Sequence, residues 1–290
     1  MQYHNPFRLF NISSAATDKT AISVLEQRID KEYAAFGLQE TVTYNGTRLK
    51  LEELKRCLHE LQNPKLETFH LELLKKTELL NFLEYGHLGY FQNNSEHIED
   101  SGMMEFIAPY FAYQYSEALI QALKVQDSET IALLVNQKLP LSEANENLYF
   151  YDTAFYLNDS LKDLEKLKED PRLFVMSERE LALQLPDKVI ENYNVLPAYF
   201  NELRDSIGLT VRQLAENITI QGGRREGAIV LIKQVLKLNL SNELSKELQS
   251  LLKQLNPGLG RVPLFLIIGT GIILLLFLLK WLETNFFQTS

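Results

Sequence analysis

The segment TDKTAISVLEQRIDKEYAAFG, residues 17–37, spaces its apolar side chains three and four positions apart. At that spacing they lie on one face of an α-helix: Ile22, Leu25, Ile29, Tyr33 and Phe36. Thr17 has the hydroxyl of a helix N-cap, and Gly37 is suited to end the helix. The segment therefore predicts an amphipathic helix whose apolar face packs on a core.

The same spacing recurs along the chain and predicts an all-α fold. Further helices are expected at residues 49–61, 65–83, 110–125, 128–139, 147–168, 178–185, 189–208, 211–221, 225–238 and 244–255. Residues 41–46, TVTYNG, are short, β-branched and turn-like, and we interpret them as a loop. Residues 87–102, HLGYFQNNSEHIEDSG, lack helical spacing. The expected organisation is a helical unit at 1–86, a linker at 87–102 and a helical domain at 103–256.

One glycine-rich stretch, Gly222–Gly227 (GGRREG), allows two interpretations. A phosphate-binding loop would need a preceding strand and a following Lys-Ser/Thr pair, and both are missing. We therefore interpret it as a turn between antiparallel helices at 211–221 and 225–238. That helical hairpin resembles a tetratricopeptide-type pair through Ala215, Ala228, Ile232 and Val235, although a series of repeats of about 34 residues is not visible.

The strongest single signal is residues 262–279, VPLFLIIGTGIILLLFLL, which carry no charge. A helix of that length rises about 27 Å, and adding residues 280–282 brings it to about 31 Å, close to the hydrocarbon thickness of a bilayer. A buried core helix is disfavoured because it would lack a polar face over five turns. We expect a single transmembrane helix at 262–282 that acts as a tail anchor. Because the N-terminal segment MQYHNPFRLF has no signal-like apolar run, the preceding residues are expected to face the cytoplasm.

Composition narrows the function classes. The chain has 290 residues, 46% hydrophobic and 23% charged, with a formal net charge of -9. This balance is that of a folded protein, and the negative charge argues against general affinity for nucleic acid or for anionic lipid headgroups. The single cysteine, Cys57, excludes an intramolecular disulfide and is typical of a reducing compartment. It shares a helical stripe with leucines, so we expect a buried, unreactive thiol.

The N-terminal unit carries a resemblance to a known family. Residues 5–12, NPFRLFNI, followed by 16–18, ATD, resemble the opening of a J-domain, and residues 52–66, EELKRCLHELQNPKL, resemble its third helix. In particular, the chain is similar to a bacterial DnaJ-related group that opens with an NPFR-type sequence. The resemblance covers residues 1–86, under a third of the chain. It implies a J-like helical unit and a DnaK-type chaperone as the partner.

One departure changes what the resemblance implies. J-domain co-chaperones stimulate the ATPase of a DnaK-type chaperone through a His-Pro-Asp triplet between their second and third helices. The corresponding interval here, residues 34–46 (AAFGLQETVTYNG), contains none of the three. The preceding helix lacks a dense basic face, since Arg28 and Lys31 stand among acidic residues. The resemblance therefore implies a retained scaffold without the ATPase-stimulating activity.

No pattern of catalytic, cofactor-binding or metal-ligating residues is identified. The five histidines, His4, His59, His70, His87 and His97, form no zinc motif. The aromatic run 149–151, with 155–156, could form a ligand platform, but helix packing is the preferred interpretation because consecutive rings point to different faces.

The expected function is a non-catalytic, membrane-anchored cytoplasmic adaptor that binds a protein partner, in a chaperone- or stress-related assembly. No cofactor and no nucleic acid are expected to take part. Two alternatives stay open: an active co-chaperone that engages a DnaK-type ATPase despite the missing triplet, and an enzyme whose site is assembled from scattered acids and tyrosines.

Overall fold

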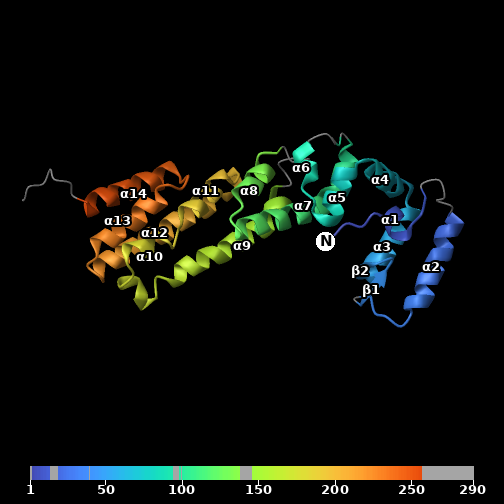
Figure 1. Ribbon diagram of the computed structural model, residues 1–290, viewed down its shortest axis with the longest axis horizontal. Coiled ribbons are helices and arrows are strands. Elements are labelled where there is room, and N and C mark those ends of the chain that lie inside the picture. The colour runs from blue at the N-terminus through green and yellow to red at the C-terminus, as the bar shows by residue number, and fades with distance from the viewer. Residues whose placement is uncertain are drawn as a thin grey trace, which may run out of the picture. The chain divides into compact units, whose positions relative to one another are not determined.

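The computed structural model describes residues 2–13, 19–38, 40–93, 98, 100–137 and 146–256 (Figure 1). Helices make up most of this part of the chain, and its one sheet has two strands. The predicted helical fold class is thus confirmed in its coarse form. Contacts divide the chain into a first unit, Met1–Ser160 with Glu191–Phe200, and a second unit, Leu161–Ile190 with Asn201–Ser290.

The first unit opens with two helices, α1 (Pro6–Phe10) and α2 (Lys19–Tyr33). The side chain of Asn5 caps α1 by accepting a hydrogen bond from the backbone N–H of Phe7, and Pro6 takes the first helical position, where its missing N–H costs nothing. The predicted helix at 17–37 is α2, which ends before Gly37. Its predicted cap, Thr17, lies outside the described residues.

Residues 41–46 are not a loop, and that interpretation is wrong. They belong to a hairpin in which β1 (Thr41–Tyr44) pairs antiparallel with β2 (Thr47–Lys50). Asn45 and Gly46 both have positive φ, 45° and 80°, as a tight two-residue turn between twisted strands requires. Side chains along a strand alternate between its two faces, and in β1 this places Val42 on the buried face of the hairpin.

The hairpin leads directly into α3 (Leu51–Gln62), which packs antiparallel to α2. Lys55 Nζ lies 2.7 Å from Asp30 Oδ1, and Gln62 Nε2 donates to Glu26 Oε2 at 3.1 Å. Between α1, α2, α3 and the hairpin lies one apolar cluster. Its buried members are Phe7, Leu9, Phe10, Ile22, Ile29, Val42, Tyr44, Leu49, Leu51, Leu54, Cys57, Leu58 and Leu61.

The rest of the first unit, where the structure describes it, is mostly helical. The helices are α4 (Pro64–Lys75), α5 (Thr77–Tyr85), α6 (Gly89–Asn93), α7 (Ser101–Lys124), α8 (Ser128–Val135) and the greater part of α9 (Glu146–Lys166). The single helix predicted at 65–83 is divided into α4 and α5 at Lys76. Part of the expected linker at 87–102 forms α6, whose Phe91 is buried against Phe82 and Phe111. Apolar contact thus orders a stretch that lacks helical periodicity.

The C-terminal part contains further short and long helices. They are η2 (Pro171–Phe174), α10 (Glu178–Ala182), α11 (Asp187–Val195), η3 (Ala198–Phe200), α12 (Asn201–Ile220), α13 (Arg225–Val235) and α14 (Asn242–Leu255). The prediction of one helix at 189–208 is wrong, because the chain breaks near Pro197 and α12 continues through Gly208. That glycine is no helix end: a Cβ there would lie 2.8 Å from Leu244 Cδ2. Gly208 therefore permits close helix packing.

In the second unit, α12, α13 and α14 run up, down and up. The turn at 221–224 joins α12 to the antiparallel α13, which confirms the interpretation of the glycine-rich stretch. Asp205 Oδ1 accepts a 2.8 Å bond from the backbone N–H of Ser241, and Arg212 Nη1 donates to Glu247 Oε2 at 2.6 Å. Helices α12 and α14 therefore run parallel to each other.

Among the helices that the structure describes, none is long and apolar enough to cross a membrane. The predicted transmembrane helix at 262–282 lies outside the described residues.

Candidate partner-binding groove

The NPFR opening of the chain is held by a buried polar network. Asn5 Nδ2 donates to the backbone oxygen of His70 on α4 at 3.0 Å, and the Asn5 backbone N–H donates to Glu84 Oε1 on α5 at 2.8 Å. Arg8 Nη1 lies 2.8 Å from Glu84 Oε2. The motif therefore attaches α1 to α4 and α5, and its residue types are explained by structure.

A tyrosine–histidine–glutamate arrangement belongs to the same network. Tyr3 Oη and His70 Nδ1 share a 2.7 Å hydrogen bond, and His70 Nε2 lies 3.2 Å from Glu60 Oε2. Burial raises the pKa of the Tyr3 hydroxyl, and nearby Glu84 and Glu60 raise it further. Tyr3 and His70 are at most 1% exposed, so a dissolved substrate does not reach them. The arrangement is that of a structural network.

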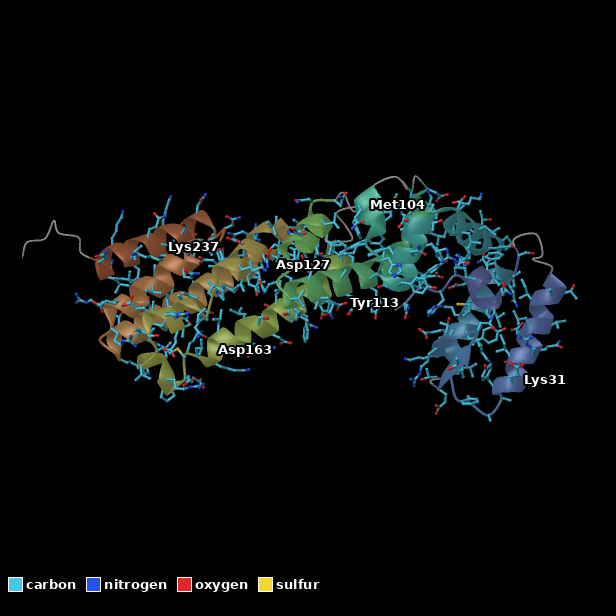
Figure 2. All side chains as sticks on the ribbon, viewed as in Figure 1. Lys31, Met104, Tyr113, Asp127, Asp163 and Lys237 are labelled. Carbon is cyan, nitrogen blue, oxygen red and sulfur yellow. The ribbon has the colours of Figure 1, made fainter. Side chains whose placement is uncertain are left out.

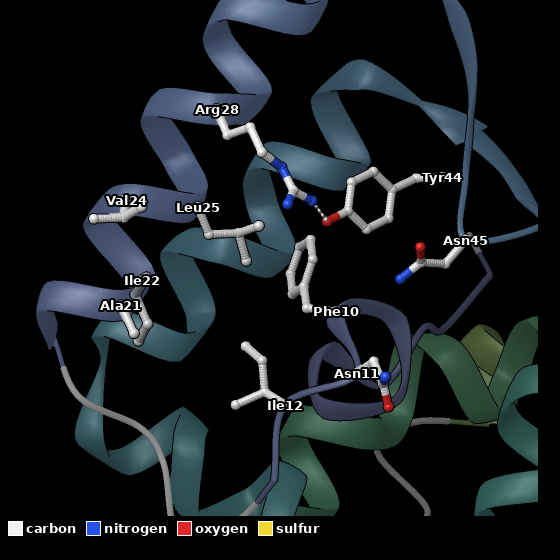
Figure 3. Close-up of a pocket in the computed structure, with 10 residues that line it drawn as sticks. All are labelled: Phe10, Asn11, Ile12, Ala21, Ile22, Val24, Leu25, Arg28, Tyr44 and Asn45. Atoms are coloured by element: carbon white, nitrogen blue, oxygen red, sulfur yellow. Dashed lines mark hydrogen bonds between the residues drawn. The ribbon is translucent and has the colours of Figure 1, made fainter.

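An open groove lies elsewhere in the first unit, between α2, the end of α1 and the turn of the hairpin (Figure 3). Its volume is about 420 Å³, within the usual range of about 300–1,000 Å³ for ligand sites. The lining is mostly apolar on the α1 and α2 sides. The residues that line it are Phe10, Asn11, Ile12, Ala21, Ile22, Val24, Leu25, Arg28, Tyr44 and Asn45.

The polar end of the groove is formed by Arg28, Tyr44 and Asn45. Arg28 Nη2 donates to Tyr44 Oη at 3.0 Å (Figure 3), and Arg28 Nε lies 3.5 Å from Glu32 Oε1. Asn45 Nδ2 donates to the backbone oxygen of Leu9 at 2.8 Å, which fixes the hairpin turn against α1. A guanidinium has five N–H donors, and the Arg28 side chain is 58% exposed. This end is therefore suited to a hydrogen-bond acceptor such as a carboxylate or a peptide carbonyl.

The rim of the groove is apolar as well. Val24 lies at its outer edge and is 62% exposed (Figure 3). Among the described residues that line the groove, the titratable side chains are Arg28 and Tyr44. The arrangement is suited to binding an apolar side chain next to a polar acceptor.

The other residues that the sequence drew attention to do not form a site. Cys57 is buried as predicted, and its burial, with Glu60 nearby, raises the pKa of the thiol to about 12. Burial lowers the pKa of His4. Within the described ranges, no three His, Cys, Asp or Glu side chains are arranged to hold a metal ion. In the glycine-rich turn, Arg224 Nη1 donates to the backbone oxygens of Phe174 and Met176, a structural use.

The aromatic run on α9 divides between two environments. Tyr149 and Phe150 are buried, as the packing interpretation predicts, and Ser116 Oγ donates to the backbone oxygen of Tyr149 at 2.6 Å. Tyr151 and Phe155 are 65% and 60% exposed. The packing interpretation is therefore confirmed for the first two rings and wrong for the two exposed ones.

Sequence reasoning missed the groove. The periodicity of α2 identifies Ile22 and Leu25 as members of one apolar face, but the polar end depends on the hairpin. The Asn45-Gly46 pair, which follows residues 41–44 (TVTY) and precedes Thr47, was the signal that could have revealed that hairpin.

Comparison with protein-family models, with curated proteins and with solved structures finds no match to this chain.

Proposed function

We propose that the chain is a non-catalytic adaptor, attached to the cytoplasmic side of a membrane by residues 262–282, that binds a protein partner in the groove of the first unit. The observation that carries the proposal is the groove itself, which is mostly apolar on its α1 and α2 sides, open at Val24 and polar at the Arg28 end. An apolar side chain of the partner enters the groove, and Arg28 donates a hydrogen bond to an acceptor beside it. Neither a cofactor nor a nucleic acid takes part.

The membrane attachment is supported by the sequence of residues 262–279. Fourteen of these positions are Leu, Ile, Val or Phe, and none is charged. On an insertion scale such residues favour the bilayer by about 0.3–0.6 kcal/mol each at the helix centre. Lys280 and Trp281 follow, and both residue types suit the membrane interface.

The first unit is proposed to be a J-like scaffold. In support, a short α1 is followed by a longer α2 and an antiparallel α3, with α4 next in sequence. The interval between α2 and α3, where the family carries its His-Pro-Asp triplet, holds the β1–β2 hairpin instead. On α2, Arg28 is engaged by Tyr44 and Glu32, whereas Lys31 is exposed (Figure 2). These features support a scaffold that has lost ATPase stimulation.

The second unit is proposed to use tetratricopeptide-like packing. Ala215 on α12 and Ala228 on α13 are fully buried where the two helices meet, and the small Gly227 lies close to Leu181 of α10. Small residues at these positions allow the close helix approach on which such hairpins depend.

A photo-crosslinking residue placed at position 24 tests the groove. In membranes that contain the full chain, we expect a discrete crosslinked partner from position 24 and none from position 23, which is an exposed neighbour on α2 that does not line the groove. With the partner identified, Val24→Asp should weaken its binding at least about tenfold, because a carboxylate at the rim must be desolvated on docking. Ser23→Asp is the matched control. Equal crosslinking from both positions, or unchanged affinity for Val24→Asp, contradicts the proposal.

The active co-chaperone is a second candidate, favoured by the same helix order. It is separated from the adaptor by the ATPase rate of a DnaK-type chaperone with and without the full chain. The adaptor proposal expects an unchanged rate. A clear increase supports the co-chaperone instead.

A further inference from the structure

The two most exposed large hydrophobic side chains of the described residues are both in the second unit. Ile220, at the end of α12, is 80% exposed, and Val175, after η2, is 79% exposed. Burying such side chains away from water is favourable, and the fold of the second unit leaves both of them outside its core.

These two side chains lie at the same end of the unit. Arg224, in the turn after Ile220, donates hydrogen bonds to the backbone oxygens of Phe174 and Met176, on either side of Val175. In addition, a Cβ on Gly222 would lie 3.2 Å from Phe174 Cδ1. The segment that carries Val175 is thus fastened to the turn between α12 and α13.

The end of α14 lies at that end as well. Arg212 and Glu247 are bonded across α12 and α14, which advance in the same direction. Ile220 and Leu255 each follow eight residues later, a rise of about 12 Å on both helices. Both helices therefore finish at one level, and Figure 1 shows the end of α14 beside the start of α13.

Sequence distance connects this end to the apolar segment. Only residues 257–261 separate Asn256, where α14 is capped, from Val262. A chain of that length spans at most about 20 Å when fully extended. A bilayer that holds residues 262–279 is therefore within about 20 Å of the end of α14.

The exposed charges at this end are compatible with lipid headgroups. Arg225 and Lys253 are exposed there, with Glu226 and Glu178 as exposed acidic neighbours, and Arg261 follows in the sequence. Basic residues that flank an apolar surface are typical of contact with anionic lipid. This differs from the chain as a whole, whose formal net charge is -9.

We propose that this end of the second unit, the membrane-facing tip formed by Val175, Ile220, Arg225 and Lys253, docks on the surface of an anionic lipid bilayer. Ile220 and Val175 enter the interfacial layer, while Arg225 and Lys253 contact phosphate groups. The inference rests on the proposed membrane attachment, and it adds an end-on orientation of α12, α13 and α14 to it.

Depth-dependent quenching in reconstituted full-length protein tests the tip. Cys57 is buried, so an environment-sensitive fluorophore attaches selectively to a cysteine introduced by Ile220→Cys or Val175→Cys. The matched control is Leu209→Cys, an exposed apolar position on the same helix, about 16 Å before Ile220. The vesicles contain phosphatidylcholine and phosphatidylserine, with a fraction of nitroxide-labelled lipid. Circular dichroism confirms that each variant keeps its helix content.

The tip proposal expects the labels at 220 and 175 to be blue-shifted and strongly quenched, and the label at 209 to be unaffected. Unquenched labels at 220 and 175 on protein that floats with the vesicles overturn the tip and leave the membrane attachment standing. Equal quenching at 209 overturns the end-on orientation. A blue shift without lipid quenching means that protein covers the tip and likewise overturns it. Protein that fails to float with the vesicles contradicts the attachment itself, and the tip with it.

Discussion

Arg8 on α1 and Glu84 on α5, 76 residues apart in the chain, form a 2.8 Å ion pair in which the Glu84 side chain is only 6% exposed. The other oxygen of the same carboxylate accepts the backbone N–H of Asn5. Glu84 thus connects both ends of the NPFR motif to α5.

We expect Glu84→Ala to lower the free energy of unfolding by about 3 kcal/mol, because it leaves the buried Asn5 N–H without its acceptor and removes the ion-pair partner of Arg8, whose guanidinium then keeps the 3.4 Å bond to Asn81 Oδ1. Glu84→Gln retains an acceptor oxygen and should cost about 1 kcal/mol, since Arg8 is partly exposed. Urea unfolding measures both. Glu117→Gln, at an exposed site on α7, is the control and should stay within about 0.5 kcal/mol of the wild type. Equal effects of all three substitutions would show that the ion pair does not hold α1.

Two glycines on either side of β1 should respond oppositely to alanine. Gly46 has φ of 80° in the hairpin turn, so Gly46→Ala should cost about 1 kcal/mol. Gly37 has no positive φ, and the nearest atom to an added Cβ there is Glu40 Cγ at 3.9 Å. Gly37→Ala should therefore be neutral or slightly stabilising. If thermal unfolding shows the same loss for both, the turn geometry at Asn45-Gly46 is wrong.

Gly208→Ala in α12 should lower the free energy of unfolding even though alanine favours helices. Propensity alone would stabilise Gly208→Ala by about 1 kcal/mol. The added methyl would approach Leu244 Cδ2 to 2.8 Å, and we expect overpacking to produce a net loss of about 1–2 kcal/mol instead. Combining it with Leu244→Ala removes the 2.8 Å contact and leaves the 3.1 Å contact with Leu240 Cδ2, so the double variant should be more stable than the sum of the single effects predicts. Additive effects in this double-mutant cycle would contradict the packing of α12 on α14.

Cys57 should make stability pH-dependent in the alkaline range. Burial raises the pKa of its thiol from 9.0 to about 12, so the unfolded chain releases this proton at lower pH than the folded one. The stability linked to the neutral thiol is complete below about pH 9 and is lost as pH rises toward about 12. Above about pH 9, the free energy of unfolding should fall more steeply in the wild type than in Cys57→Ala, by up to about 1.4 kcal/mol per pH unit. Parallel profiles in urea titrations would mean that Cys57 is not buried.

Most of the helices can be predicted from the sequence, because their buried side chains recur three and four positions apart. Ile22 and Ile29 on α2, and Leu54 and Leu58 on α3, are buried as the spacing indicates. The errors occur where a residue type is explained by contacts with a distant segment and not by the local structure that it usually indicates. Gly208 resembles a helix stop by composition, but contact with α14 requires its small size.

The candidate site was less accessible to sequence reasoning. Apolar periodicity marks the α2 side of the groove, but Tyr44 and Asn45 reach it only through the hairpin turn. The groove combines residues from three separate segments, and a pattern within one segment cannot indicate their meeting. The membrane-facing tip likewise depends on the parallel course of α12 and α14, which only their mutual contacts establish.

Alkaline extraction of membranes from cells that express the full chain tests the central claim, attachment through residues 262–282, most directly. We predict that the full chain stays with the membranes at high pH, while a variant with Ile267→Arg and Ile273→Arg is released. Each arginine near the centre of a spanning helix costs about 2.5–3.5 kcal/mol of insertion free energy. Release of the unaltered chain, or equal retention of the arginine variant, would contradict the account.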